Sequence, residues 1–214
     1  NDYKINGLVE NGNIDLLNQG VLEKINFDFN FKKDDYIFNQ INFRLKNIKF
    51  NSDKLRIKKK KDIFLVRGSL NNNQSSLDNN LLKLLNLNFK NFNVKDVKFK
   101  SKNNFTLEID NKLKINNFTI NSNLEIAQLK YERPEIVQSY ISNTNNFILL
   151  EDHKLNLNYK KNNLIVSGEG KIQLDEGKSK IKYSINKNNE EFDIKTELLI
   201  NNINLKKQDF LKIY

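Results

Sequence analysis

The chain has 214 residues, a formal net charge of +10 and a hydrophobic fraction of 38%. This is too apolar and too regular for a disordered chain, and the length fits a single all-β domain. With no cysteine and one histidine, disulfides, thiol chemistry and the usual zinc sites are not expected. No apolar run approaches the roughly 18 residues of a membrane-spanning helix. Residues with A/T-rich codons dominate, so the positive charge only weakly supports a polyanionic partner.

Apolar and polar residues alternate through most of the chain. Residues 25–31 (INFDFNF) have Ile or Phe at every second position. Because successive side chains of a strand point to opposite sides, each such run predicts a strand with one apolar and one polar side. Further runs occur at 41–45, 48–50, 105–109, 113–115, 118–120, 124–126, 155–159, 172–174, 181–185 and 192–194.

Short polar clusters separate these runs and predict turns, since Asn, Asp and Ser side chains bond to the local backbone and tolerate left-handed conformations. The repeated order of strand, turn and strand predicts an antiparallel meander. A change of phase near Asn47 predicts a bulge. The lysine-rich stretch 56–62 (RIKKKKD) is interpreted as a solvated turn. The other clusters are 32–35, 51–53, 101–104, 110–112, 160–163 and 187–190.

Two segments are predicted to be short helical insertions, near 77–88 and 134–142. In the first, Asp78 is a suitable N-cap and lies within a polar stretch, 71–80, that predicts a loop. In the second, Pro134 would occupy the first helical position, followed by Glu135 in the first turn. Both are short, and we expect them to cover an edge or end of the sheet.

No group of residues predicts catalysis. His153 lies in a polar stretch (EDHK) and is expected at the surface or in a turn. The acidic pairs at 34–35, 175–176 and 190–191 lack metal-ligand spacing and are interpreted as turn carboxylates. The sequence Gly168-Glu169-Gly170 predicts a bulge or kink within a strand. We therefore predict a protein that is not an enzyme and that has no cofactor and no metal.

Nucleic-acid binding is also not predicted. Proteins that bind single strands combine a clustered cationic groove with exposed aromatic rings. In this chain the lysines are spread over turns and polar strand positions, mixed with 26 acidic residues, and most of the Phe residues fall on the apolar positions of strands.

The apolar positions are the candidate binding residues. Strands with one apolar side must close as a sandwich or barrel, or form a trough that something else fills, and the pattern alone leaves these alternatives open. If the sheet is a trough, its candidate lining residues are Phe27, Phe29, Phe31, Ile41, Phe43, Leu45, Leu107, Ile109, Phe118, Ile120, Leu155, Leu157, Ile172, Ile181 and Ile185.

Several segments resemble the AsmA-like superfamily of bacterial envelope proteins, in particular its YhdP and TamB branch. The resemblance lies in the texture of the strands and includes no catalytic motif. The segments are 7–17 (GLVENGNIDLL), 25–31, 41–50 (INFRLKNIKF), 62–68 (DIFLVRG), 97–101 (VKFKS), 113–124 (LKINNFTINSNL) and 164–172 (LIVSGEGKI).

The resemblance implies a long, twisted antiparallel meander that forms a β-taco-like groove. Residues 1–214 would be one continuous β-groove segment of a larger protein, anchored in the inner membrane through regions outside the segment and lying in the periplasm. Its groove would hold phospholipid acyl chains and carry phospholipid between the inner and outer membranes. The alternative is a structural β-sandwich module of the cell envelope that has no lipid cargo.

Overall fold

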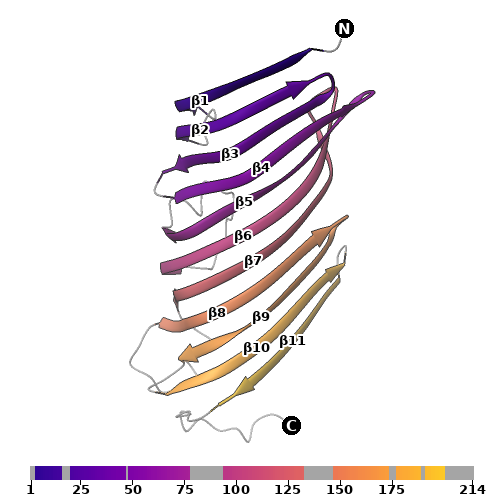
Figure 1. Cartoon of the computed structure of the whole chain (residues 1–214). Helices are drawn as coiled ribbons and strands as arrows, with labels where there is room; N and C mark the ends of the chain where they lie inside the picture. The colour runs from indigo at the N-terminus through magenta and orange to yellow at the C-terminus, as the bar shows by residue number, and fades with distance from the viewer. Residues whose placement is uncertain are drawn as a thin grey trace, which may run out of the picture.

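The part of the chain that the structure describes forms a single antiparallel β-sheet. The computed structural model describes residues 3–15, 20–46, 48–77, 94–132, 147–173, 177–188 and 191–200. These contain an 11-stranded sheet in which the strands follow their order in the chain. Figure 1 shows the strands as a ladder from indigo β1 to yellow β11, with the strands in the middle of the sheet curved along their length. The predicted mainly β fold and its antiparallel meander are confirmed.

The strands have between 9 and 18 residues, which is long for a globular protein, where five or six is typical. Their bounds are β1 Lys4–Asp15, β2 Val21–Lys32, β3 Asp35–Leu45, β4 Ile48–Lys60, β5 Ile63–Leu77, β6 Val94–Asp110, β7 Ile115–Glu132, β8 Phe147–Lys160, β9 Asn163–Gln173, β10 Lys178–Asn188 and β11 Glu191–Leu199.

Several predicted turns are confirmed, and they are tight. Residues 33–34, 61–62, 111–112 and 161–162 are turns. Lys161 and Asn162 both have positive φ angles, 48° and 64°, as in the two-residue turns that match the twist of a hairpin. The lysine-rich stretch is only partly a turn, because residues 56–60 belong to β4 and the chain reverses at 61–62.

Other predicted turns and loops are wrong. Residues 51–53 lie inside β4, residues 101–104 lie inside β6, and residues 71–77 of the predicted loop belong to β5. Asn47, where a bulge was predicted, lies outside the described residues; the change of phase falls between two strands, since β3 ends at Leu45 and β4 begins at its partner Ile48. These polar residues continue strands because both neighbouring strands supply backbone partners, which outweighs their weak intrinsic β propensity.

The predicted helical insertions fall almost entirely outside the described residues. The segment 134–142 lies wholly outside them, and so does 78–88 of the first insertion. Leu77, where that insertion was expected to begin, is the last residue of β5. The described residues contain strands and turns and no helix, and therefore no helix long and apolar enough to cross a membrane.

Bulges or other register shifts interrupt most of the long strands. At five of them a non-glycine residue has a positive φ angle, namely Asn11, Lys24, Gln40, Asn117 and Asp152. The register with a neighbouring strand shifts at or beside each of these positions. A bulge bends its strand and increases the local right-handed twist, so these residues contribute to the curvature of the sheet.

The described strands form one layer. Extensive contacts between strands occur only between neighbours in the chain. The chain exposes 15489 Å², whereas a compact monomer of this mass exposes about 10,300 Å². Among the described residues, the buried apolar side chains are Ile25, Ile48, Val66, Val97, Ile148 and Ile172. The core is therefore thin and spread over the whole sheet.

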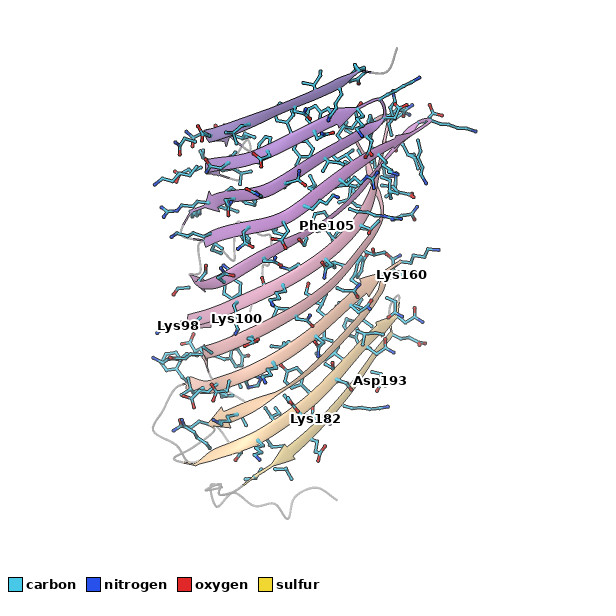
Figure 2. All side chains as sticks on the ribbon, viewed as in Figure 1. Lys98, Lys100, Phe105, Lys160, Lys182 and Asp193 are labelled. Atoms are coloured by element: carbon cyan, nitrogen blue, oxygen red, sulfur yellow. The ribbon has the colours of Figure 1, made fainter. Side chains whose placement is uncertain are left out.

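A row of alternating charges crosses strands β6 to β11. Lys100 is the cross-strand partner of Glu125, with an Nζ to Oε2 distance of 2.6 Å. Successive partners across the sheet continue the alternation of sign. The full row is Lys100, Glu125, Lys154, Glu169, Lys182 and Glu197 (Lys100 and Lys182 are labelled in Figure 2). Opposite charges on facing positions stabilise one register, and a slip of one residue would break every pair.

Candidate apolar binding surface

The candidate lining residues all lie in strands, on β2, β3, β6, β7, β8, β9 and β10. Cross-strand partners point to the same side of a sheet. Phe29, for example, is the partner of Phe38 on β3, and Leu157 is the partner of Val166 on β9. Most candidates are partly exposed, whereas Ile172 is buried.

One row of partners crosses all eleven strands. Except for Lys187, every member is apolar, aromatic or glycine, and the Lys187 ammonium lies 5.0 Å from the centre of the Phe192 ring. The row consists of Gly7, Phe29, Phe38, Leu55, Gly68, Phe105, Ile120, Tyr159, Leu164, Lys187 and Phe192.

An aromatic cluster joins β2 to β3 along this side. The Phe27 and Phe38 ring centres are 5.5 Å apart, and Phe31 lies 5.3 Å from Phe38, both in edge-on arrangements. Phe31 also lies 4.6 Å from Phe29 and 5.4 Å from Tyr36. Such pairs contribute about 0.5–1.5 kcal/mol each beyond the area that they bury. The rings thus stabilise the strands, although all five side chains stay partly exposed.

The glycines of β9 make room for rings from β8 and β10. A Cβ atom on Gly168 would lie 2.5 Å from Cζ of Tyr183, and one on Gly170 would lie 2.5 Å from Cγ of His153. The pairing of β9 with β10 is regular through both glycines. The predicted bulge or kink at Gly168-Glu169-Gly170 is therefore wrong, and the irregularity lies on β8 at Asp152, opposite Gly170.

His153 is buried in the sheet, so its predicted position at the surface or in a turn is wrong. It lies in β8, is the partner of Ile126, and is 1% exposed. Its Nε2 lies 2.9 Å from the Lys171 carbonyl oxygen, and its Nδ1 lies 3.5 Å from the Tyr183 hydroxyl. Because a carbonyl only accepts, Nε2 carries the proton and donates it there, which leaves Nδ1 as an acceptor in the neutral ring.

Acidification is expected to destabilise the fold through His153. Burial lowers the pKa of His153 below 6.5, so the unfolded chain takes up this proton at a higher pH than the folded chain does. The contribution to stability is complete above about pH 6.5 and decreases as the pH falls below it, by at most about 1.4 kcal/mol per pH unit. Urea unfolding between about pH 8 and pH 5 measures this slope, because carboxylates titrate lower and lysines higher.

His153→Phe provides the control for this experiment, since its ring cannot be protonated. We expect the pH dependence between about pH 8 and pH 5 to disappear in the variant, whatever its absolute stability. Equal slopes in the variant and the wild-type chain would show that another group causes the effect.

Small polar residues interrupt the alternation of apolar residues along several strands. Ser101 is the partner of both Asn72 and Leu124. It therefore lies in the apolar phase, by which we mean the alternate strand positions that are in register with the row from Gly7 to Phe192. The Asn72 amide donates to the Ser75 hydroxyl at 2.6 Å. Ser52 Oγ and Asn72 Oδ1 have no hydrogen-bond partner among the described residues. Sequence reasoning missed most of this group because it interpreted 51–53, 71–80 and 101–104 as turns or loops. The buried members among the described residues are Ser52, Asn72, Ser75, Ser101, Ser122 and Ser179.

Only some residues of the three acidic pairs lie in the described part of the chain. Asp34 is in a turn, as predicted, but Asp35 begins β3 and accepts two hydrogen bonds, of 2.7 and 2.6 Å, from the Arg56 guanidinium. This hydrogen bonding lowers the pKa of Asp35. Residues 175, 176 and 190 lie outside the described part, and Glu191 begins β11. Among described residues, no group of three or more His, Cys, Asp or Glu is arranged to hold a metal ion.

Comparison of the chain with protein-family models, curated proteins and solved structures finds no match. The resemblance to AsmA-like envelope proteins therefore stays a prediction, and the geometry of the sheet carries the functional argument.

Proposed function

We propose that this chain is a lipid-carrying β-groove, a segment of a periplasmic envelope protein that moves phospholipid between the inner and outer membranes. The observation that supports it is an apolar phase that continues in register across eleven strands, from Gly7 to Phe192, on a single sheet. Phospholipid acyl chains would lie along this surface, because covering it removes apolar area from water, a gain of about 25 cal/mol per Å².

The ends of the sheet suit this role. In a meander every second turn lies at the same end, so the turns after β2, β4, β6, β8 and β10 share one rim. Lysines gather there, and a lysine near an anionic bilayer contributes about 1 kcal/mol of attraction. Phospholipid headgroups would therefore lie near this rim. Its lysines are Lys32, Lys33, Lys58, Lys59, Lys60, Lys61, Lys112, Lys114, Lys160, Lys161 and Lys187.

The alternative, a scaffold that closes as a β-sandwich, has less support. Among the described strands, β1 pairs with β2 alone and β11 with β10 alone, in one open sheet. A sandwich needs a second sheet to bury the apolar side of the first.

Purification of the chain followed by mass spectrometry of its lipid extract tests the proposal. We expect phospholipid to co-purify in near-stoichiometric amount, and a long-chain fluorescent fatty acid to bind after delipidation. A folded chain, judged by its β circular dichroism, that carries no lipid and binds no probe would favour the scaffold.

A further inference from the structure

Among the strands that the structure describes, β11 is an edge strand of the sheet. It pairs with β10 through a regular register from Asn188 opposite Glu191 to Lys180 opposite Leu199. In an antiparallel strand the backbone groups of alternate residues point to opposite neighbours, so half of those in β11 point away from β10. Its apolar side chains are exposed as well, Phe192 and Ile194 at 62% each. Such an edge favours the addition of another strand unless something blunts it.

The sequence of β11 complements itself about Thr196. In an antiparallel pair of β11 strands with Thr196 opposite Thr196, Lys195 lies opposite Glu197 of the second copy, and Glu197 opposite its Lys195. On the other side of the ribbon, Ile194 lies opposite Leu198, and Phe192 opposite Ile200. Each pair occurs twice, because a twofold axis relates the copies.

We propose that two copies of this chain pair edge to edge through β11, about a twofold axis at Thr196. The charge row of the sheet supports this register. It ends at the edge with Glu197, whose partner on β10 is Lys182, and the second copy supplies Lys195 on the open side. The alternation of sign thus continues across the interface.

The same register keeps the apolar sides together. Thr196 and Leu198 are partners of Tyr183 and Ile181, so both belong to the apolar phase of the sheet. In this register, apolar-phase residues of one copy pair with apolar-phase residues of the other. The twofold axis at Thr196 must therefore be perpendicular to the plane of the sheet. The two sheets then form one continuous sheet with its apolar sides facing the same way. This inference goes beyond the proposed function and holds whether or not lipid is bound.

The opposite edge is less suited to this pairing. Lys4 and Glu10 lie symmetrically about Gly7 in β1, but the register of β1 with β2 shifts twice, between Val9 and Gly12 and between Gly12 and Ile14. Bulges twist an edge away from incoming strands. Strand β11 has no register shift with β10, so it offers the longer regular edge.

Charge reversal tests the interface. We expect the wild-type chain to sediment as a dimer at micromolar concentration. Lys195→Glu places Glu opposite Glu twice and should raise the dimer dissociation constant at least tenfold. The double variant Lys195→Glu, Glu197→Lys restores both pairs across the interface and should restore the dimer, although its new lysine then faces Lys182 on β10 of the same chain.

Lys180→Glu is the matched control, since it makes the same charge change on β10, one strand in from the edge, and should leave the dimer unchanged. A wild-type monomer at all concentrations would overturn the proposal. So would a dimer that Lys195→Glu leaves intact, which would indicate pairing through β1 or another surface.

Thiol crosslinking tests the register. The chain has no cysteine, so a single substitution gives one thiol per copy. Thr196→Cys places the two thiols opposite each other, and we expect rapid covalent dimerisation with a short bifunctional thiol reagent. Ile194→Cys separates the thiols by four residues, roughly 13 Å along the strand, and should react slowly. Equal rates for the two variants would contradict this register.

Discussion

Phe118→Asp is expected to abolish lipid binding while the sheet stays folded. Phe118 lies on β7 in the apolar phase, near the rim, with its ring centre 5.9 Å from that of Tyr159. It is 36% exposed, so a carboxylate there can remain hydrated in the lipid-free chain. Bound acyl chains would strip water from that charge, and burying an unpaired charge is strongly unfavourable. Titration with a fluorescent fatty acid measures the loss.

Asn121→Asp is the matched control for this substitution. Asn121 lies three residues further along β7, is exposed, and has Asn104 and Asn158 as partners in the polar phase. We expect it to introduce the same charge without reducing probe binding. If both variants bind the probe as the wild-type chain does, the apolar phase is not where lipid binds. If both lose binding, the effect is a general one of charge.

Gly170→Ala is expected to destabilise the fold by about 1–3 kcal/mol, the usual cost of overpacking. The added methyl would lie 2.5 Å from Cγ and 2.7 Å from Nε2 of His153. The imidazole has little room to yield, because it is 1% exposed and bonded to the Lys171 carbonyl. Urea unfolding at pH 8, where the ring is neutral, measures the change in the free energy of unfolding.

A double-mutant cycle separates this contact from a general effect of alanine on the strand. His153→Ala removes the ring and leaves space above Gly170, so Gly170→Ala should cost far less in that background. Contacting residues commonly show coupling energies of about 0.5–3 kcal/mol. Additive effects would mean that the imidazole and the glycine do not constrain each other.

Where the apolar alternation was clear, the sequence predicted strands correctly. Residues 25–31 lie in β2 and residues 155–159 in β8, joined to their neighbours by the predicted tight turns. Prediction failed where polar residues continue a strand, as at 101–104 in β6. The alternation could have been followed even there, because Phe99, Ser101, Asn103 and Phe105 occupy every second position.

His153 is a similar case. Its neighbours in a polar stretch suggested exposure, yet it lies two and four residues before Leu155 and Leu157, in their apolar phase. Only cross-strand pairing explains how the sheet accommodates it, because the space for the ring comes from Gly170, on the next strand. A local pattern predicts on which side of the sheet a residue lies, but not which residue of the neighbouring strand lies opposite it.

By itself, the sequence determined the alternation of apolar and polar side chains, the hairpin turns and hence the antiparallel meander, because these depend on residues within a few positions of one another. Only the tertiary structure decided the register of the eleven strands. That register aligns Lys and Glu into one row, sets rings over glycines and leaves β11 as a regular edge of the described strands. Each of these features joins residues from different strands, and their spacing along the chain depends on bulges and turns that local patterns do not specify.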